Sequence, residues 1–273
     1  MPKIGVTEAG DASLDYSWMK KADDMDMLVL ITKNVTDEFI KKALLYEKKA
    51  IVHATCTGMG GTILEPCVPA WRHQVDKAVR LIHMGFPEKQ VVLRIDPLFP
   101  TEKGLRKFEE IVDYAHSYIK RYRISVIDNY KHVKERFKAA GLPILYGGNF
   151  IASDEEFGMV DSLIKKLKLR YPDISIECCA EPKLEYAEHI GCVSSKDLAL
   201  FGLKPSGVKQ DNRYGCLCEA KKELLPFNHY WWCSKHSKHV SRAGSCECGN
   251  CKDCKNLQVY GCANRCLYCY WKT

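Results

Sequence analysis

The chain has 273 residues, of which 46% are hydrophobic and 27% are charged, and its formal net charge is +7. These values are typical of a soluble globular protein with one sizeable α/β domain and a small additional module. They exclude a membrane-spanning chain, because no apolar run approaches the ~20 residues that cross a bilayer. Residues 1–5 show no signal-peptide hydrophobic core, so we expect a cytoplasmic protein with no membrane partner.

Strands and helices alternate through the first two thirds of the chain. Apolar, β-branched runs predict strands over 3–7, 27–32, 50–56, 90–95, 122–127 and 173–178, and a weaker one over 143–146. Helices are predicted over 12–23, 37–49 with Thr36 as N-cap, 71–84, 101–121, 131–140 and 154–171. This alternation predicts an α/β fold with a parallel sheet, in the form of a partial or complete (β/α) barrel. Chemistry in such a barrel lies on loops at the carboxyl ends of the strands.

Cysteines are concentrated near the end of the chain. Ten of the 15 lie between Cys216 and Cys269. In a reducing compartment, this number of cysteines favours metal binding over disulfides.

The last cysteines follow another short apolar run, at 257–260. Three residues separate Cys262 from Cys266, and two separate Cys266 from Cys269. Three thiolates in one tight loop suit a four-iron cluster with one iron left open. The alternative is a zinc knuckle, which needs a fourth protein ligand.

This terminal motif, Cys-x-x-x-Cys-x-Tyr-Cys, resembles the signature of the radical S-adenosylmethionine (SAM) enzymes. In that family the open iron binds the amino and carboxylate groups of SAM, and one electron splits SAM into methionine and a 5′-deoxyadenosyl radical. The resemblance implies an enzyme with a [4Fe-4S] cluster and SAM as cofactors. It also implies a reductase or a flavodoxin-like protein as the electron donor.

Other segments extend the resemblance. Thr32-Lys33, Leu64-Glu65-Pro66 and Arg94-Ile95-Asp96-Pro97 resemble the spore photoproduct lyase-like branch of these enzymes. The last third resembles an uncharacterised bacterial and phage group with the cluster motif at the C-terminus. The matching segments are Cys179-Ala180-Glu181, Gly191-Cys192, Cys216-Leu217-Cys218 and the terminal motif.

The position of the motif implies a circularly permuted barrel. Most of the family carries the cluster loop after the first barrel strand, whereas here it ends the chain. Permutation is tolerated because the chain ends of compact domains often lie close together. We therefore expect a barrel over 1–205, a cysteine-rich metal-binding module over 206–255, and a final barrel strand with the cluster loop over 256–273. The final strand would close the barrel beside the first.

The resemblance also implies cofactor-binding residues at the strand ends. The polar turn with Glu8, Gly10 and Asp11 would hold the methionine end of SAM, or it would only cap the next helix. The aromatic ring of Tyr268 would lie near the adenine, or it would only pack in the core. Charged side chains at strand ends face a ligand or form structural ion pairs. They are Lys33, Glu65, Arg72, Arg94 and Asp96.

A second metal site is expected from Cys179, Cys192, Cys216 and Cys218, as an auxiliary iron–sulfur cluster or zinc. Cys179 has an alternative role as a catalytic hydrogen-atom donor. The run with Cys246, Cys248, Cys251 and Cys254 predicts a further zinc site or cluster, and Cys233, His236 and His239 are weaker candidate ligands.

Basic charge accompanies these cysteines, since residues 206–273 hold 11 Lys and Arg and 5 Asp and Glu, a balance of +6. With Tyr230, Trp231 and Trp232, this charge suits DNA or RNA, or it only offsets metal-bound thiolates. The sequence predicts a radical SAM enzyme that modifies or repairs a nucleic acid or nucleobase. The alternatives are a non-catalytic, zinc-stabilised nucleic-acid-binding protein and an electron carrier.

Overall fold

The computed structural model describes residues 1–8, 10–205, 219–226 and 262–269, together with the backbone of 230–233, 238–240 and 257–260. Within them, no helix is both long enough and apolar enough to cross a membrane.

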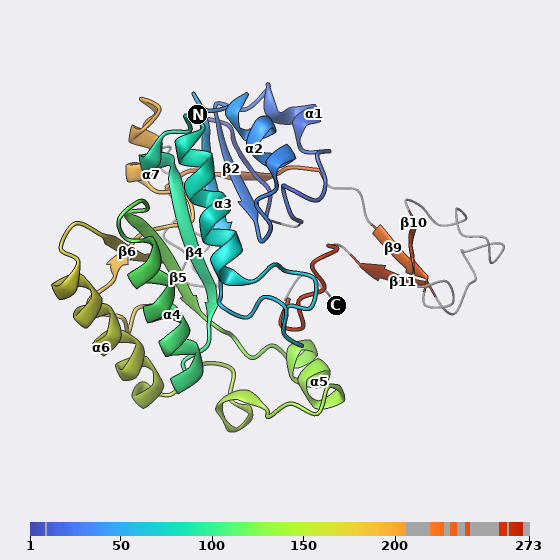
Figure 1. The fold of residues 1–273 in the computed structure, drawn as a ribbon, viewed down its shortest axis with the longest axis vertical. Coiled ribbons are helices and arrows are strands. Elements are labelled where there is room, and N and C mark those ends of the chain that lie inside the picture. The colour runs from blue at the N-terminus through green and yellow to red at the C-terminus, as the bar shows by residue number, and fades with distance from the viewer. Residues whose placement is uncertain are drawn as a thin grey trace.

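A parallel eight-stranded sheet forms the centre of the described chain (Figure 1). Its order is β7-β6-β5-β4-β3-β2-β1-β8, so neighbouring strands mostly follow one another in sequence. The strands are β1 (Ile4–Val6), β2 (Met27–Thr32), β3 (Ala50–Thr55), β4 (Val91–Leu98), β5 (Arg121–Val126), β6 (Ser175–Cys178), β7 (Glu188–His189) and β8 (Lys222–Leu224). The predicted α/β fold is confirmed, and the described strands form a partial barrel with β7 and β8 at its edges.

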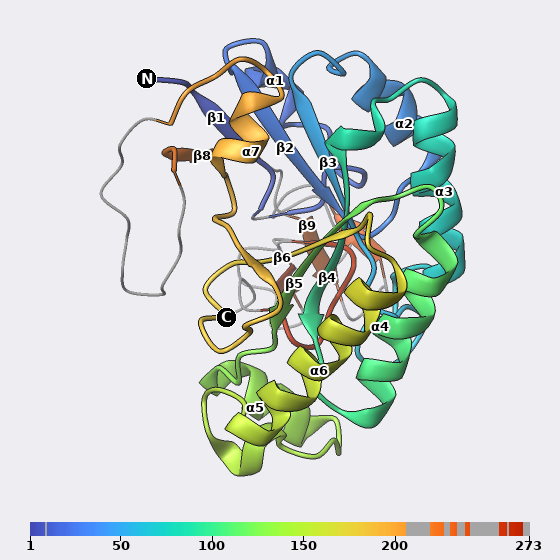
Figure 2. The ribbon, with the colours of Figure 1, turned by 90° about the vertical axis from the view of Figure 1, so that its left-hand side faces the viewer.

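Helices alternate with the strands, as the sequence predicts. They are α1 (Met19–Ala22), α2 (Asp37–Leu44), α3 (Trp71–His83), α4 (Glu102–Ala115), α5 (Lys131–Ala139), α6 (Asp154–Arg170) and α7 (Ser195–Ala199), with 3₁₀ turns η1 (Glu88–Gln90) and η2 (Leu145–Gly148). Thr36 caps α2 by accepting from Phe39 N, and a Ser153–Glu156 capping box begins α6. Figure 2 shows α3, α4 and α6 on one side of the sheet and α7 on the other.

The side of the sheet that faces away from α3 and α4 is apolar at β2, β3 and β4 and charged at β5 and β6. Val29, Ile51 and Val92 pack with Leu198 of α7 in one buried cluster. Next to them, Arg121 and Arg123 of β5 pair with Glu177 of β6 and Asp197 of α7 at 2.7–3.3 Å. These four charges are buried and fully paired, and we call them the ionic floor.

Two local predictions are wrong. Of the helix predicted over 12–23, only α1 forms, because Asp11 and Asp15 accept from the backbone N–H of Ser13 and Ser17 and stabilise turns instead. The strand predicted over 143–146 is replaced by η2, where Tyr146 and Gly147 have positive φ.

The predicted final barrel strand is also wrong in its partners. Residues 257–260 form strand β11 (Leu257–Tyr260), but it pairs antiparallel with β9 (Tyr230–Cys233), which also pairs with β10 (Lys238–Val240). The place beside β1 is taken by β8, from within the predicted 206–255 module. The predicted domain boundaries at 206 and 256 therefore do not follow the two sheets.

Candidate active site

The loop 262–269 lies at the carboxyl end of the parallel sheet, although its preceding strand belongs to the small sheet. Leu267 N donates to Leu64 O at 2.9 Å. Cys266 and Tyr268 are buried in a cluster with Met59 and Phe99, and Cys269 packs against this cluster. Figure 1 shows this loop in red beside α5. The expected neighbourhood of the loop is thus reached without the expected strand.

The three thiols of this loop share one environment. Burial raises the pKa of Cys266 to about 12, while the nearby Lys33 ammonium opposes the rise. Burial also raises the pKa of Cys262, and Asp11 and the other two thiols add to that effect. Because Cys266 and Cys269 both act electrostatically on Cys262, the three thiols lie near one another.

Asp11 ties the cysteine loop to the first two strands. Its buried carboxylate accepts from Thr32 Oγ1 at 2.7 Å, from Lys33 N at 2.8 Å and from Asn264 Nδ2 at 2.5 Å. Asn264 is itself buried, and its Oδ1 has no hydrogen-bond partner among the described residues. A buried acceptor without a partner is costly, so this atom marks a place where a ligand donor would be stabilised.

Lys33, Glu65 and Tyr268 form a compact buried triad. Lys33 Nζ lies 2.8 Å from Glu65 Oε1 and donates to Tyr268 OH at 2.7 Å, and Tyr268 OH donates to Glu65. Thr57 Oγ1 donates to the other Glu65 oxygen at 2.7 Å. Burial opposes ionisation of Glu65, but Lys33, Tyr268 and Thr57 together lower the pKa of that carboxyl. The triad therefore holds an ammonium group beside the cysteine loop.

The remaining predicted cofactor residues are placed in different ways. Arg94 and Asp96 form an ion pair on β4 and are about one-fifth exposed. Gly10 lies in the loop with Asp11, and Glu8 pairs with Lys222 of β8 at 3.1 Å. Arg72 does not reach the site, because its guanidinium lies over the rings of Trp71 and Tyr114 on the outer helices.

Sequence analysis assigned no role to two carboxyl groups at the mouth of the partial barrel, although Glu181 stands in one of the matching segments. Burial raises the pKa of Glu181 to about 8 and that of Asp128 to about 6, and Asp96 adds to both shifts. Glu181 accepts from Val126 N at 2.7 Å and from Ser125 Oγ at 3.0 Å. Perturbed carboxyls of this kind are common at functional sites. Their signal in the sequence is an acid a few residues beyond a buried strand.

The second predicted metal site is half described. The Sγ atoms of Cys179 and Cys192 are 3.5 Å apart, at the carboxyl ends of β6 and β7. Cys216 and Cys218, the other expected ligands, lie outside the described residues. The next residue in the chain, Glu219, donates its N–H to Val193 O at 3.0 Å, which follows Cys192.

The expected ligands of the cysteine-rich module, Cys246, Cys248, Cys251, Cys254 and His236, also lie outside the described residues, as do the side chains of Cys233 and His239. Within the described part of the chain, no three His, Cys, Asp or Glu side chains converge closely enough to hold a single metal ion.

The fold and this site define a parallel α/β protein with a cysteine loop at the carboxyl edge of its sheet. The chain belongs to the family described as "Domain of unknown function (DUF1848)", which matches residues 13–271 and so includes the cysteine loop. No curated protein matches the chain.

Proposed function

We propose that this protein is a radical SAM enzyme whose [4Fe-4S] cluster is held by Cys262, Cys266 and Cys269. The observation that carries the proposal is the position of the three thiols. They lie at the carboxyl edge of a parallel sheet, beside the ammonium of Lys33 and the buried amide of Asn264. Three cysteines leave one iron of such a cluster without a protein ligand.

The residues present fit both cofactors. Cysteine sulfur is the ligand that cluster iron takes, and a cluster of four irons spans more space than one ion. The three thiols therefore need not converge as tightly as in a mononuclear zinc site. Fourfold cysteine ligation of zinc would require another ligand from outside the loop. When bound, the cluster would supply the electron that cleaves SAM into methionine and a 5′-deoxyadenosyl radical.

The polar side chains around the loop suit the methionine end of SAM. Lys33 donates to Glu65 and Tyr268, and a third donor of its ammonium is left for the SAM carboxylate. Asn264 Oδ1 would accept from the SAM amino group and so satisfy a buried acceptor. Asp11 fixes the Asn264 side chain from the opposite end of its amide. Glu65 and Tyr268 position the ammonium of Lys33.

We infer that the substrate is a nucleobase, free or in a nucleic acid. Asp96 lies near the end of β4, Asp128 follows β5 and Glu181 follows β6, and Asp96 acts electrostatically on both of the others. Carboxyl groups near the carboxyl ends of strands can bind the N–H edges of a base. In a nucleic acid, the target base would be taken out of the stack to reach them. The +6 charge balance of residues 206–273 suits the phosphates outside the barrel.

The test is anaerobic reconstitution with iron and sulfide, followed by metal analysis and incubation with dithionite and SAM. We expect about four irons and four sulfides for this site, and formation of 5′-deoxyadenosine, as a [4Fe-4S] cluster requires. Cys266→Ala should abolish deoxyadenosine formation. Cys178→Ala, which removes a buried thiol of β6 outside the loop, is the matched control and should retain it. Zinc without deoxyadenosine would support the nucleic-acid-binding protein instead.

A further inference from the structure

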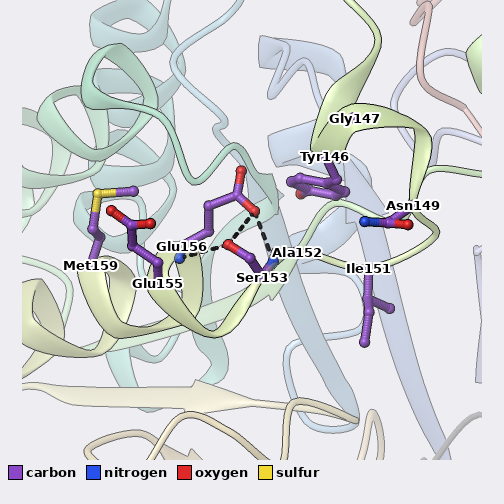
Figure 3. Close-up of a pocket in the computed structure, with 9 residues that line it drawn as sticks. All are labelled: Tyr146, Gly147, Asn149, Ile151, Ala152, Ser153, Glu155, Glu156 and Met159. Atoms are coloured by element: carbon purple, nitrogen blue, oxygen red, sulfur yellow. Dashed lines mark hydrogen bonds between the residues drawn. The ribbon is translucent and has the colours of Figure 1, made fainter.

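An open pocket of about 600 Å³ lies between the η2 turn and the start of α6. Its volume is in the range of sites that bind small molecules. Figure 3 shows Tyr146 and Asn149 on one side of the pocket and Glu155 and Met159 on the other, with Glu156 between them. The pocket therefore joins the turn that follows α5 to the first turns of α6.

Tyr146 connects this pocket to the mouth of the partial barrel. Its side chain packs against the apolar cluster of the cysteine loop. Its OH donates to Ile127 O at 2.8 Å, and Asp128 is the next residue in the chain. Burial raises the pKa of the Tyr146 hydroxyl, and the carboxyl groups of Glu156, Asp128 and Glu181 add to this shift. Tyr146 thus adjoins both the pocket and the carboxyl groups of the mouth.

The η2 turn holds Tyr146 in a conformation that residues other than glycine rarely adopt. Its φ is 57° and its ψ is 30°, in the left-handed region. The buried amide of Asn129 fixes the turn by donating to Leu145 O at 2.8 Å and to Asn149 O at 2.9 Å. Strained residues that their surroundings enforce are often found at ligand-binding sites. The Tyr146 ring is therefore a fixed wall of the pocket.

One part of the lining suits a nucleobase. The Tyr146 ring offers a flat surface, and the exposed side chains of Ile151 and Met159 add apolar surface. The side-chain amide of Asn149 supplies both a hydrogen-bond donor and an acceptor. Bases stack on aromatic side chains, and amides bind their polar edges.

The other part of the lining is acidic. Glu155 and Glu156 contribute to it, and none of the nine described residues that line the pocket is Lys, Arg or His. Glu156 Oε2 accepts from Ser153 N at 2.7 Å and from Ser153 Oγ at 2.9 Å, which fixes that carboxylate. Glu155 is exposed, so its carboxylate is accessible to a ligand.

Two lysines bind next to this acidic part but do not line the pocket. Lys134 Nζ donates to Gly148 O at 2.5 Å, and Lys183 pairs with Asp154 at 2.6 Å. Carboxylates accept from sugar hydroxyls, as an acidic residue does for ribose in dinucleotide-binding folds, whereas they repel phosphate. The lining therefore favours a sugar that carries no phosphate.

We propose that this pocket binds a free nucleoside, with its base against the Tyr146 ring and its sugar hydroxyls on Glu155; this deepens the proposed function and rests on it. A base beside Tyr146 reaches the mouth, because Tyr146 adjoins Asp128 and Glu181. A nucleic acid is disfavoured in the pocket, because its phosphates would pass the two glutamates.

The experiment measures binding to the reconstituted protein by isothermal titration. The ligands are the four common ribonucleosides, their 5′-monophosphates and the corresponding 2′,3′-dideoxynucleosides, which lack two sugar hydroxyls. We expect at least one ribonucleoside to bind at least about tenfold more tightly than its 5′-monophosphate and its dideoxy form. Glu155→Gln should lower the affinity for that ribonucleoside by about tenfold and reduce both differences.

Glu102→Gln is the matched control, because it removes an exposed carboxylate from the first turn of α4 as Glu155→Gln does from α6. It should bind the ribonucleoside as the wild type does. The proposed pocket would be overturned if no ribonucleoside bound, if a 5′-monophosphate or a single-stranded oligonucleotide bound as tightly, if Glu155→Gln had no effect, or if stoichiometric SAM displaced the ribonucleoside. Absence of deoxyadenosine from the wild type with dithionite would instead refute the proposed function, while the binding comparison would still test the pocket.

Discussion

The two ends of the inner face of the sheet hold buried charges in opposite ways. At the ionic floor, two guanidinium groups face two carboxylates, and all four are nearly inaccessible. At the mouth, burial raises the pKa of Glu181 and that of Asp128, and the neighbouring carboxyl group of Asp96 adds to both shifts. The charges of the ionic floor are paired with one another, whereas the mouth retains ionisable groups with perturbed pKa values.

This difference separates a structural role from a functional one. Complete pairing at the floor holds β5, β6 and α7 together. Groups that the fold leaves uncompensated are candidates for binding a ligand, because a ligand can supply the missing partners. The Lys33–Glu65–Tyr268 triad combines features of both ends. Its charges are paired, as at the ionic floor, but its ammonium lies beside the cysteine loop.

The largest effect is expected from removing one guanidinium group of the ionic floor, and it concerns the stability of the fold. Arg123→Ala would leave Glu177 and Asp197 buried with one cation fewer, so we expect a loss of about 3–5 kcal/mol in the free energy of unfolding. Urea unfolding followed by circular dichroism measures it. Arg106→Ala, which removes an exposed ion pair of α4, is the control and should leave the stability nearly unchanged. A similar small effect for Arg123→Ala would contradict the structural role of the floor.

A smaller effect is expected from the triad, and it should appear in cofactor binding. Lys33→Met removes the ammonium that we assign to the SAM carboxylate. A hydrogen bond between charged groups contributes about 1.5–3 kcal/mol, so SAM affinity should fall by roughly ten- to a hundredfold. Isothermal titration of the reconstituted protein measures the dissociation constant. Lys41→Met, at an exposed position of α2, should bind SAM as the wild type does. Wild-type affinity in Lys33→Met would remove Lys33 from the site.

The smallest effect is a pH dependence with opposite signs at the two ends. The folded pKa of Glu181 is raised, so its contribution to stability is present below the unfolded pKa and is lost as the pH rises through about 8. At the floor, burial opposes ionisation of Glu177, but Arg123 and Arg121 lower its pKa, so its contribution is lost as the pH falls.

The variant Glu181→Gln separates the contribution of Glu181 to the pH dependence of stability from that of the ionic floor. Glutamine does not ionise, so the free energy of unfolding of the variant should rise relative to that of the wild type by about 1–2 kcal/mol between pH 6 and pH 8.5. Unfolding curves at the two pH values measure the difference, with Glu155→Gln on the exposed surface of α6 as control. A pH-independent difference between wild type and Glu181→Gln would show that Glu181 is not held in its protonated form.

Hydrophobic periodicity was enough to predict most of the parallel sheet. The buried strands around Leu30, Val52 and Leu93 are apolar on both faces, and the N-cap at Thr36 is a local signal. The pairing of residues 257–260 could not be predicted in this way. A four-residue apolar run identifies a strand but not its neighbour, and β8, with the sequence Lys-Glu-Leu, has no pattern that would predict a strand beside β1.

The candidate site, like the fold, has features that the sequence could predict and features that it could not. Motif spacing made the three cysteines candidates, and the strand ends did the same for Asp11, Lys33 and Glu65. The contact of Asn264 with Asp11 joins residues that are 253 positions apart, so only the fold reveals it. The perturbed pKa of Glu181 depends on burial, which its sequence neighbours do not determine.

The most direct test of the central claim is the electron paramagnetic resonance spectrum of the reconstituted protein, reduced with dithionite, before and after addition of SAM. The account predicts the signal of a reduced [4Fe-4S] cluster that changes when SAM binds and that is lost in Cys266→Ala. A protein that contains zinc and gives no such signal, or a cluster signal that SAM leaves unchanged, would contradict it.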